Sequence, residues 1–596
     1  MQIPAFSFLR NARVALSFLV VGILAIIALV YWPVWHAGFV WDDKSTFLDT
    51  ASLRSSDWWR YLLGGVENWV NYFRPLVLAL YSVEIRLFHA APMPLHLVSL
   101  ALHLANTTLV GMLALQLQRD TTTLRPYLAA LSMLVYGLHP ALVEPVVWIS
   151  CQYDLVATLF VLLALWLNLA IVRTIPRALA VASCFFLAAC AKESAACLPL
   201  LLMLFDAAAL TGVHPDRDAL QRLWRRQGLV YAGVLAAGIA YLALRDFALG
   251  HLVKPIGGEH LFSIQHFQKI CYTYLSYWRI GLWPMVGLGP LHIVDAERFA
   301  QFDVAMLGID VASVLIASAG FASFLKGRPI GAFILAFSLA LTPVLNIVPT
   351  LFVESLYHER YAMLAIAMGA AWLPAVVSAA LRRTAGLRLL RAVLALVVAG
   401  WLVLAVFNIR ATIPMWSDEL NLWQWALRQN PDSIVVKDHL LSEYMRRGDY
   451  APARALASSL LDDKRRCANC LLNIANLSLL YGDSKNAAKA LARIRNEGME
   501  LLYEPRLRQG FMVATGELEE MKGATADAES SFRDAIAADP HDPLAAEQLA
   551  YFLARQGRLP EAQAAADKAI ELYAPAERDV HRKSLDDFIN AAKLRR

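Results

Sequence analysis

The stretch VALSFLVVGILAIIALVYWPVWHAGFVWDD, residues 14–43, decides the fold. It opens with an uncharged run from Val14 to His36, which is long enough to cross a bilayer as a helix. The acidic pair Asp42 and Asp43 follows directly. Two adjacent carboxylates are costly inside lipid but suit the boundary between membrane and water. The pair therefore indicates either an interfacial site with acidic chemistry or an ordinary solvated loop or helix cap.

The composition predicts a polytopic membrane protein with an all-α fold. Of the 596 residues, 58% are hydrophobic and only 17% are charged, whereas roughly a quarter are charged in soluble proteins. Further apolar runs follow up to about Arg410, and they add to about eleven spans of bilayer length. We therefore expect a helical membrane domain over residues 1–411 and a polar, alanine-rich soluble domain over residues 412–596.

The positions of the basic residues predict how the chain crosses the membrane. Arg10 and Arg13 precede the first span, and cytoplasmic flanks are enriched in such residues. No signal-peptide cleavage pattern follows this span, so we expect it to be retained. The two long loops, residues 37–92 and 248–302, are then external, with residues 263–284 interfacial or re-entrant. An odd number of spans also places the C-terminal domain outside the cytoplasm.

The C-terminal domain repeats itself. Gly448-Asp449 recurs as Gly482-Asp483, and a second pair of glycines, Gly523 and Gly557, has the same spacing of 34 residues. This is the period of tetratricopeptide (TPR) helix pairs. We predict about four repeats and a capping helix from Ala576, with residues 496–522 fitting the period poorly. Such a stack either presents a concave face to a protein or peptide, or only stabilises the chain.

The cysteines do not form a disulfide framework. Cys467 and Cys470 make a CxxC motif, which is either a local disulfide or two ordinary helix residues, because no second ligand pair completes a zinc site. The others are scattered through apolar sequence: Cys151, Cys184, Cys190, Cys197 and Cys271. The net charge of +5 is modest, and no basic-aromatic patch indicates binding to nucleic acid.

Short motifs occur where the predicted spans meet the outer side. They are Phe39–Asp43, Tyr72–Leu76, His96–Val98 with His103, His139-Pro140 followed by Glu144–Val146 and Asp154-Leu155, Ala191–Glu193, Glu359–Tyr361, and Trp416–Asp418 leading to Asn430-Pro431. In this order, and together with the repeats, they cover most of the chain. The sequence resembles the transmembrane-and-TPR O-mannosyltransferases of the GT-C class.

The resemblance implies a glycosyltransferase that moves a sugar from a polyprenyl-phosphate donor to an acceptor hydroxyl at the outer face of the membrane. Asp42 or Asp43 would be the general base, a role that suits a carboxylate at the water boundary. Four residues would bind the donor phosphate: Arg74, His139, Lys192 and Arg360. Four acidic residues would support them: Glu144, Asp154, Glu193 and Glu359.

Each of these residues also has a simpler interpretation. Arg74 could only reach from the membrane to the interface, and His139 could cap a helix. Lys192 could pair with Glu193, and Arg360 with Glu354 or Glu359. No cofactor is assigned, although a divalent cation at Asp42, Asp43 and Asp154 stays open.

The expected partners are the lipid-linked sugar donor, membrane lipid, and an acceptor protein held by the TPR domain. The setting favoured is a bacterial inner membrane with the TPR domain in the periplasm, or an ER membrane with that domain in the lumen. Two other functions stay open: a non-catalytic membrane scaffold, and a transporter or polymerase of lipid-linked glycans. A transporter would carry charges near mid-membrane, whereas the charges here gather at one face.

Overall fold

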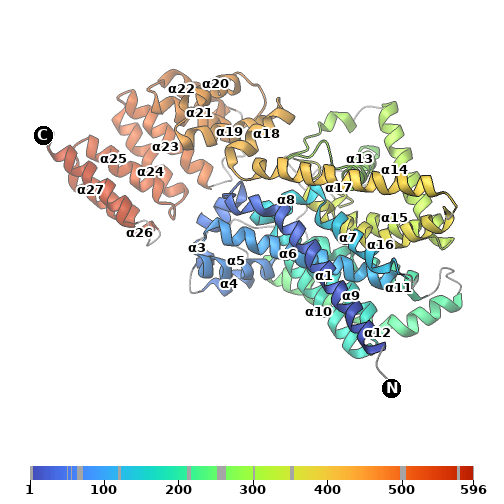
Figure 1. The fold of residues 1–596 in the computed structure, drawn as a ribbon. Helices are drawn as coiled ribbons and strands as arrows, with labels where there is room; N and C mark the ends of the chain where they lie inside the picture. Colours follow the sequence, from blue (N-terminus) through green and yellow to red (C-terminus); the bar gives the residue numbers. More distant parts are fainter. Residues whose placement is uncertain are drawn as a thin grey trace. The chain divides into compact units, whose positions relative to one another are not determined.

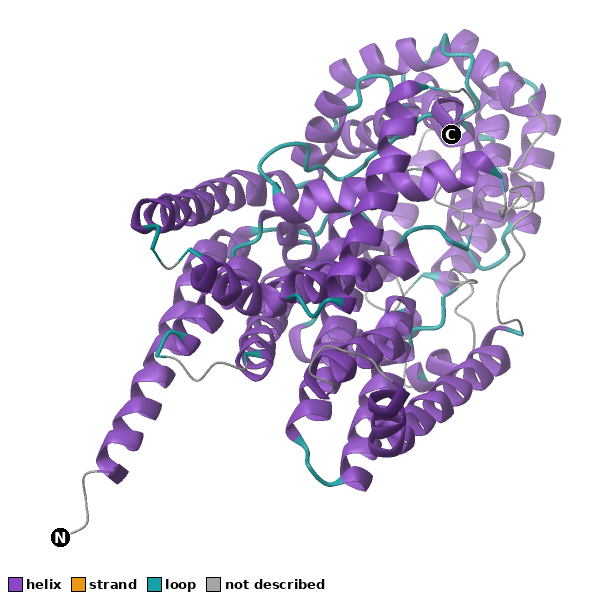
Figure 2. Ribbon diagram, turned by 90° about the vertical axis from the view of Figure 1, so that its right-hand side faces the viewer, coloured by secondary structure: helices purple, strands orange, loops and turns teal. Residues whose placement is uncertain are grey.

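The computed structural model describes residues 5–49, 51–54, 57–63, 72–118, 123–210, 217–250, 263–299, 303–348, 355–384, 386–496, 505–573 and 578–594. Every regular element in these ranges is a helix (Figure 2), which confirms the predicted all-α fold. Parts of the predicted outer loops 37–92 and 248–302 lie outside the described residues, as does Glu354.

The chain divides into two compact units, Met1–Trp425 and Ala426–Arg596 (Figure 1). The predicted boundary after residue 411 falls instead inside the helix α17 (Arg388–Trp416). That helix continues past the apolar run on which the prediction was based, and it includes the polar residues Asn408, Arg410 and Thr412. The next helix, α18 (Glu419–Gln429), contains the division between the units.

The first unit is built from long helices joined by short helical turns. In chain order they are α1 (Ala5–Tyr31), η1 (Trp32–His36), α2 (Asp42–Lys44), η2 (Ser45–Asp49), α3 (Ala51–Arg54), α4 (Trp58–Leu63), α5 (Pro75–Phe88), α6 (Pro92–Leu117), α7 (Arg125–Gly137), η3 (Pro140–Leu142), α8 (Val143–Val147), η4 (Ile149–Cys151), α9 (Gln152–Ala170), α10 (Thr174–Ala191), η5 (Glu193–Cys197), α11 (Leu198–Leu210), α12 (Arg217–Leu249), α13 (Ile264–Leu282), η6 (Ala296–Phe299), α14 (Val304–Leu325), α15 (Pro329–Leu341), η7 (Thr342–Val344), η8 (Glu359–Ala362), α16 (Met363–Arg383) and α17.

Within the described part of the chain, eight helical segments are long and apolar enough to cross a bilayer. They are Leu16–His36, Pro92–Leu117, Ile149–Ala170, Thr174–Ala191, Gln221–Leu249, Val304–Leu325, Glu359–Arg383 and Arg388–Trp416. A ninth would be α7 together with Pro140–Val147, which are bent by 53° at the break between them. These lengths and compositions are compatible with a membrane protein.

The predicted count of eleven spans is not confirmed. Residues 195–210 and 329–349 were expected to cross, but they form α11 and α15, each with only 13 residues. A helix of that length rises about 20 Å, against a hydrocarbon layer of about 30 Å. Residues 263–284 form α13, whose polar and charged residues leave it outside the candidate spans.

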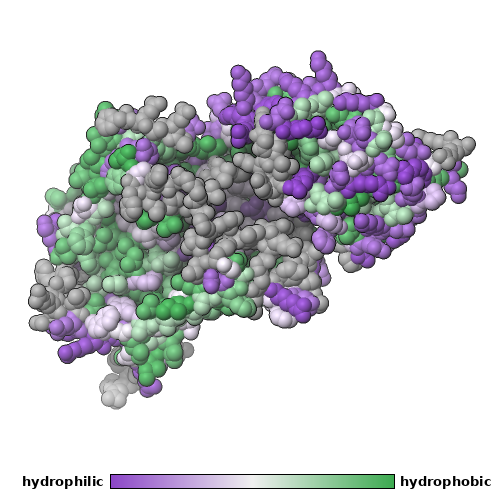
Figure 3. Space-filling model, turned by 180° about the vertical axis from the view of Figure 1, so that it is seen from behind, coloured by the Kyte–Doolittle hydropathy of each residue, from purple (hydrophilic) through white to green (hydrophobic). Residues whose placement is uncertain are grey.

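The long helices of the first unit expose apolar side chains on their outward faces. Phe18 on α1, Val304 on α14 and Leu389 on α17 are 73%, 76% and 79% exposed. Figure 3 shows hydrophobic residues over much of the visible face of this unit, whereas the visible face of the second unit is mostly hydrophilic. An exposed apolar surface of this extent is typical of a lipid-facing protein.

Polar residues of the first unit meet at one end of its helix bundle. The Arg74–Glu193, Lys192–Asp154 and Arg360–Glu144 ion pairs join segments that leave or begin α5, α9, α10 and α16. The arginines of the predicted cytoplasmic turns lie at the opposite ends of the same helices, among them Arg173 and Arg383. The bundle therefore has one end of paired charges and one end rich in arginine.

The second unit is a row of helix pairs. The pairs are α19 (Ile434–Arg447) with α20 (Tyr450–Leu461), α21 (Ala468–Leu480) with α22 (Ser484–Asn496), α23 (Pro505–Met521) with α24 (Thr525–Ala538), and α25 (Pro543–Arg555) with α26 (Leu559–Leu572), followed by α27 (Arg578–Leu594). The second helix of each pair buries an alanine with no exposed surface, and a side chain this small lets the helices approach closely: Ala453, Ala487, Ala528 and Ala562.

A glycine with positive φ ends the first helix of every pair. Gly448, Gly482, Gly523 and Gly557 have φ values of 75°, 70°, 79° and 75°, a left-handed conformation that costs glycine little. The spacings are 34, 41 and 34 residues. The longer interval explains the poor fit of residues 496–522 to the period, since α23 has 17 residues where α21 and α25 have 13 each.

Candidate functional site

The acidic pair directly follows a residue with a strained backbone conformation. Trp41, directly before the pair, has φ 52° and ψ −123°, a region that a bulky residue adopts only when its surroundings enforce it. Its ring stacks on Trp148 at 4.8 Å and meets Trp423 edge-on at 5.3 Å. Lys44, on the other side of the pair, forms an ion pair with Glu419. These contacts fix the direction of the two carboxylates.

Asp43 is held by hydrogen bonds inside the first unit. It is fully buried, and its Oδ1 accepts hydrogen bonds from the backbone N–H of Ser150 at 2.8 Å and from the Ser150 hydroxyl at 2.6 Å. Its Oδ2 accepts from the backbone N–H of Val40 at 3.3 Å. Burial raises the pKa of this carboxyl to about 7, although the bonds from Ser150 and Val40 oppose the shift. Asp43 therefore ties the first loop to the start of α9.

Asp42 points away from that anchor. It is exposed to solvent, and its carboxylate makes no hydrogen bond or ion pair with the described residues. The protein around it still raises the pKa by desolvation, while the positive charge of Arg360 lowers it. The two adjacent acids thus have different environments, and Asp42 is the one that a substrate can reach.

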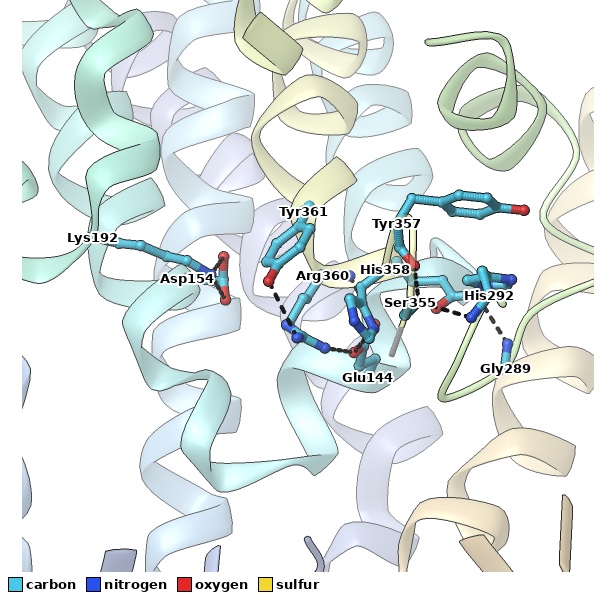
Figure 4. A network of polar contacts seen from close by, with 11 residues as sticks. Glu144, Asp154, Lys192, Gly289, His292, Ser355, Tyr357, His358, Arg360 and Tyr361 are labelled. Carbon is cyan, nitrogen blue, oxygen red and sulfur yellow. Dashed lines mark hydrogen bonds and ion pairs between the residues drawn. The ribbon is translucent and has the colours of Figure 1, made fainter. Parts of the chain in front are cut away.

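Arg360 is bound to Glu144. Its guanidinium Nη1 forms a short ion pair with Oε1 of Glu144, and its backbone N–H donates to Oε2 at 2.9 Å. The guanidinium lies 4.8 Å from the ring centre of Trp148 and 4.7 Å from that of Tyr361. Figure 4 shows Arg360 between Tyr361 and Glu144. The described partner is therefore Glu144 and not Glu359, while Glu354, the other acid considered from the sequence, lies outside the described residues.

Lys192 forms a second buried pair, with Asp154. Its Nζ lies 2.6 Å from both carboxylate oxygens, so it does not pair with its neighbour Glu193. The ammonium also lies 4.6 Å from the ring centre of Tyr361, whose other neighbour is Arg360. Tyr361 thus stands between the two cations, as Figure 4 shows.

Arg74 and Arg245 share the carboxylate of Glu193. Arg74 donates from Nε at 3.0 Å and from Nη2 at 2.9 Å to Oε2, while Arg245 lies 3.3 Å from Oε1. Burial opposes ionisation of Glu193, yet the two arginines hold its pKa below the usual range. Arg74 also lies over the ring of Tyr153 at 4.9 Å. It is therefore an internal partner and not an arginine that only reaches to the interface.

Glu359 and His139 belong to the surroundings of this cluster. Glu359 accepts from the backbone N–H of Gly289 at 2.9 Å and lies 2.8 Å from Nε2 of His292. It therefore fastens the segment before α14 to the start of α16. His139 is buried with Nε2 at 3.2 Å from the carbonyl oxygen of Gly281, and it makes no side-chain cap. Neither side chain replaces Glu144 or Asp154 as the ion-pair partner of Arg360 or Lys192.

The three acids considered for a divalent cation do not converge. Asp42, Asp43 and Asp154 are all described, and they do not bring their oxygens within 4.8 Å of one another. Asp154 forms an ion pair with Lys192, and the oxygens of Asp43 already accept hydrogen bonds. A hard divalent cation needs several convergent oxygen ligands, so this set does not fit one.

Together these residues form a cluster with an open carboxylate at its edge. We call Asp42, Arg74, Lys192, Arg245 and Arg360, with the acids that pair with them, the acid–cation cluster. Arg74 and Arg245 both lie against the carboxylate of Glu193, so this part of the cluster brings two guanidinium groups together. Such a site can bind an anion, and it can take a proton from a hydroxyl at Asp42.

Sequence reasoning did not single out Arg245, Ser150 or Tyr361 as members. Arg245 lies four residues before the end of α12, and no role was assigned to it from the sequence. Tyr361 follows Arg360 directly, so its ring could have been proposed as a neighbour of the cation. Nothing in the sequence indicates that the Ser150 hydroxyl would bind Asp43 across 107 residues.

Comparison of the sequence with models of protein families and with curated proteins finds no match.

Proposed function

We propose that this chain is a membrane glycosyltransferase of the GT-C type, which transfers a sugar from a polyprenyl-phosphate donor to a hydroxyl of an acceptor protein. The observation that carries the proposal is the open carboxylate of Asp42 next to buried, paired cations at one end of the helix bundle. Base and anion site are separate groups there, as such a transfer requires.

The cations account for the leaving phosphate. When the sugar leaves the donor, negative charge stays on the phosphate, and fixed positive groups stabilise it best in a site that excludes water. Arg360 and Lys192 meet this condition, because Lys192 is buried, Arg360 is half-buried, and both are held over aromatic rings. Their acidic partners keep them in place before the donor binds. Arg74 and Arg245, which share the carboxylate of Glu193, add two more guanidinium groups to the site.

The base and its proton follow from the two acids. Asp42 accepts the proton of the acceptor hydroxyl as the hydroxyl oxygen attacks the anomeric carbon, and the bond from that carbon to the phosphate oxygen breaks. A pKa above the usual range makes Asp42 a better base than an ordinary surface carboxylate. Asp43 holds the loop and takes no part in the proton transfer. No metal ion is needed in this scheme.

Mixing the purified protein with labelled polyprenyl-phosphate sugar and candidate acceptors tests the proposal. Label on an acceptor hydroxyl is the expected result. Movement of the sugar lipid between leaflets without transfer would instead identify a transporter, and neither result would identify a scaffold. A reaction mixture without the donor lipid is the negative control.

We propose further that the second unit is a TPR domain on the catalytic side of the membrane. Its four helix pairs, its glycine turns and its terminal helix support the repeat assignment. The disulfide between Cys467 and Cys470 supports an oxidising compartment. A bacterial periplasm or an ER lumen would satisfy this.

Cysteine labelling tests the orientation. In a cysteine-free variant, Asp57→Cys and His541→Cys should react with an impermeant thiol reagent added from outside, after the outer membrane is opened if there is one. Arg225→Cys should react only after the inner membrane is permeabilised, because arginine-rich turns stay in the cytoplasm. All three positions are exposed. External labelling of Arg225→Cys would reverse the proposed orientation.

A polar cavity in the second unit is the expected acceptor site. It has a volume of about 760 Å³ and is lined by residues of α20, α21 and α22, including Arg454 and Tyr481. Tyr481→Ala should lower transfer to the natural acceptor protein several-fold and leave transfer to a short soluble hydroxyl acceptor unchanged, since the short acceptor does not need the cavity. Leu480→Ala, one residue away and outside the lining, is the matched control. Equal loss on both acceptors would point to a stabilising role.

A further inference from the structure

The CxxC motif has a geometry that a structural clamp does not require. Cys467 is the residue before the first turn of α21, and its Sγ accepts a hydrogen bond from the backbone N–H of Cys470 at 3.2 Å. Cys467 is half-buried and Cys470 is 1% exposed. One sulfur is therefore accessible at a helix N-terminus while the other lies behind it.

A carboxylate, that of Asp438, lies beside the two sulfurs. Asp438, on the neighbouring helix α19, places an oxygen within 4.8 Å of both sulfurs. It accepts a hydrogen bond from the side-chain amide of Asn473 at 2.9 Å, and burial raises its pKa to about 6. His439, the next residue, has a pKa lowered to about 4 by burial and is neutral near pH 7. Asp438 can thus exchange a proton near neutral pH.

The sequence before the motif favours a thiolate at Cys467. Lys464, Arg465 and Arg466 precede it directly, and Arg465 is paired with Asp463. Positive charge and a helix N-terminus both lower the pKa of a thiol. The five free cysteines of the first unit are all buried, whereas Cys467 is only half-buried.

We propose that Cys467 and Cys470 form a redox-active pair that exchanges its disulfide with cysteine thiols of a partner polypeptide, with Asp438 as the proton carrier. This activity is independent of the proposed sugar transfer.

The exchange balances with a partner dithiol as reductant. A partner thiolate attacks Sγ of Cys467, the bond between Cys467 and Cys470 breaks, and the Cys470 thiolate takes a proton from the Asp438 carboxyl. The partner's second thiolate then attacks the partner sulfur of the mixed disulfide, and Cys467 leaves as a thiolate stabilised at the helix N-terminus. The partner loses two electrons and two protons and gains a disulfide, while the pair becomes the Cys470 thiol and the Cys467 thiolate. One of the two protons restores the Asp438 carboxyl through solvent, and the other stays in solution. In reverse, Asp438 takes the proton of Cys470, whose thiolate releases the partner.

The first test is selective reactivity in the full-length protein. After reduction, iodoacetamide at pH 7 should alkylate Cys467 about tenfold faster than Cys470, since reaction follows the thiolate fraction and access. Peptide mapping separates both from the five buried cysteines. With oxidised glutathione, Cys470→Ser should form a mixed disulfide at Cys467 and release one reduced glutathione, whereas Cys467→Ser should form none at the buried Cys470.

The second test concerns Asp438. A reduced synthetic peptide with two cysteines is mixed with the oxidised full-length protein, and the appearance of the peptide disulfide is followed by mass spectrometry. Asp438→Asn should slow this exchange about tenfold at pH 7, with the difference shrinking as the pH rises above about 9, where Cys470 ionises unaided. Asp462→Asn, an exposed carboxylate of the same pair of helices, should have no effect. A disulfide that resists both glutathione and the peptide, or equal alkylation with no effect of Asp438→Asn, would show a structural clamp and overturn the proposal.

Discussion

Replacing Asp42 with Asn is expected to lower single-turnover sugar transfer by about 10²–10⁴-fold, the range typical for loss of a general base. The variant should still fold, because this carboxylate makes no hydrogen bond or ion pair with the described residues. It should also bind the donor lipid about as well as the native protein, since the paired cations are untouched. Transfer and donor binding are measured on the same preparation.

The pH dependence of transfer is an independent test of Asp42 as the general base. Desolvation raises the pKa of Asp42 above the ordinary value of 3.8, so the base form is lost at a higher pH than for a surface carboxylate. The native rate should therefore fall as the pH drops through this raised pKa, and the residual rate of Asp42→Asn should lack that limb. A single-turnover pH profile of both proteins makes the comparison.

Asp43→Asn is the matched control, one residue away. It puts an amide N–H where Asp43 Oδ2 now accepts from Val40, so two donors would face each other in a fully buried place. Leaving a buried group unsatisfied costs about 1–3 kcal/mol. This variant should lose thermal stability more than it loses transfer per folded molecule. Near-native transfer by both variants would remove the catalytic role of the acidic pair and favour a scaffold.

The sequence predicted the class of fold because hydrophobic periodicity and run length depend on local composition. From these patterns we predicted the all-α class, most of the long helices and the glycine turns of the second unit. The predicted count of eleven spans is not confirmed, because an apolar run such as residues 195–210 does not reveal where its helix begins. In the structure, η5 occupies the first residues of that run and α11 starts only at Leu198.

The choice of ion-pair partners was beyond sequence reasoning for a physical reason. Lys192 has an acid next to it in the chain, yet it pairs with Asp154, because consecutive side chains at the end of α10 point in different directions. Glu193 turns instead toward Arg74 and Arg245. Residues at the ends of predicted spans could be named as members of a site, but their pairing depends on how the spans pack.

Replacing Arg360 with Leu is expected to have the largest effect on stability. It would leave Glu144 as a buried carboxylate without its ion-pair partner, and loss of one member of a buried pair typically costs about 3–5 kcal/mol. Glu144 would keep one hydrogen bond, because the backbone N–H of residue 360, now 2.9 Å from Oε2, is still present in the variant. The loss of stability would therefore report on the guanidinium alone. Thermal unfolding in detergent should show the loss directly.

The double variant Arg360→Leu with Glu144→Leu separates stability from function. Removing both charges avoids the unpaired carboxylate, so the melting temperature should recover most of what the single variant lost. Transfer should not recover, because Arg360 would no longer meet the donor phosphate beside Lys192. If the double variant regained transfer together with stability, Arg360 would be a structural residue, and the anion site would have to lie at Arg74, Arg245 and Lys192 alone.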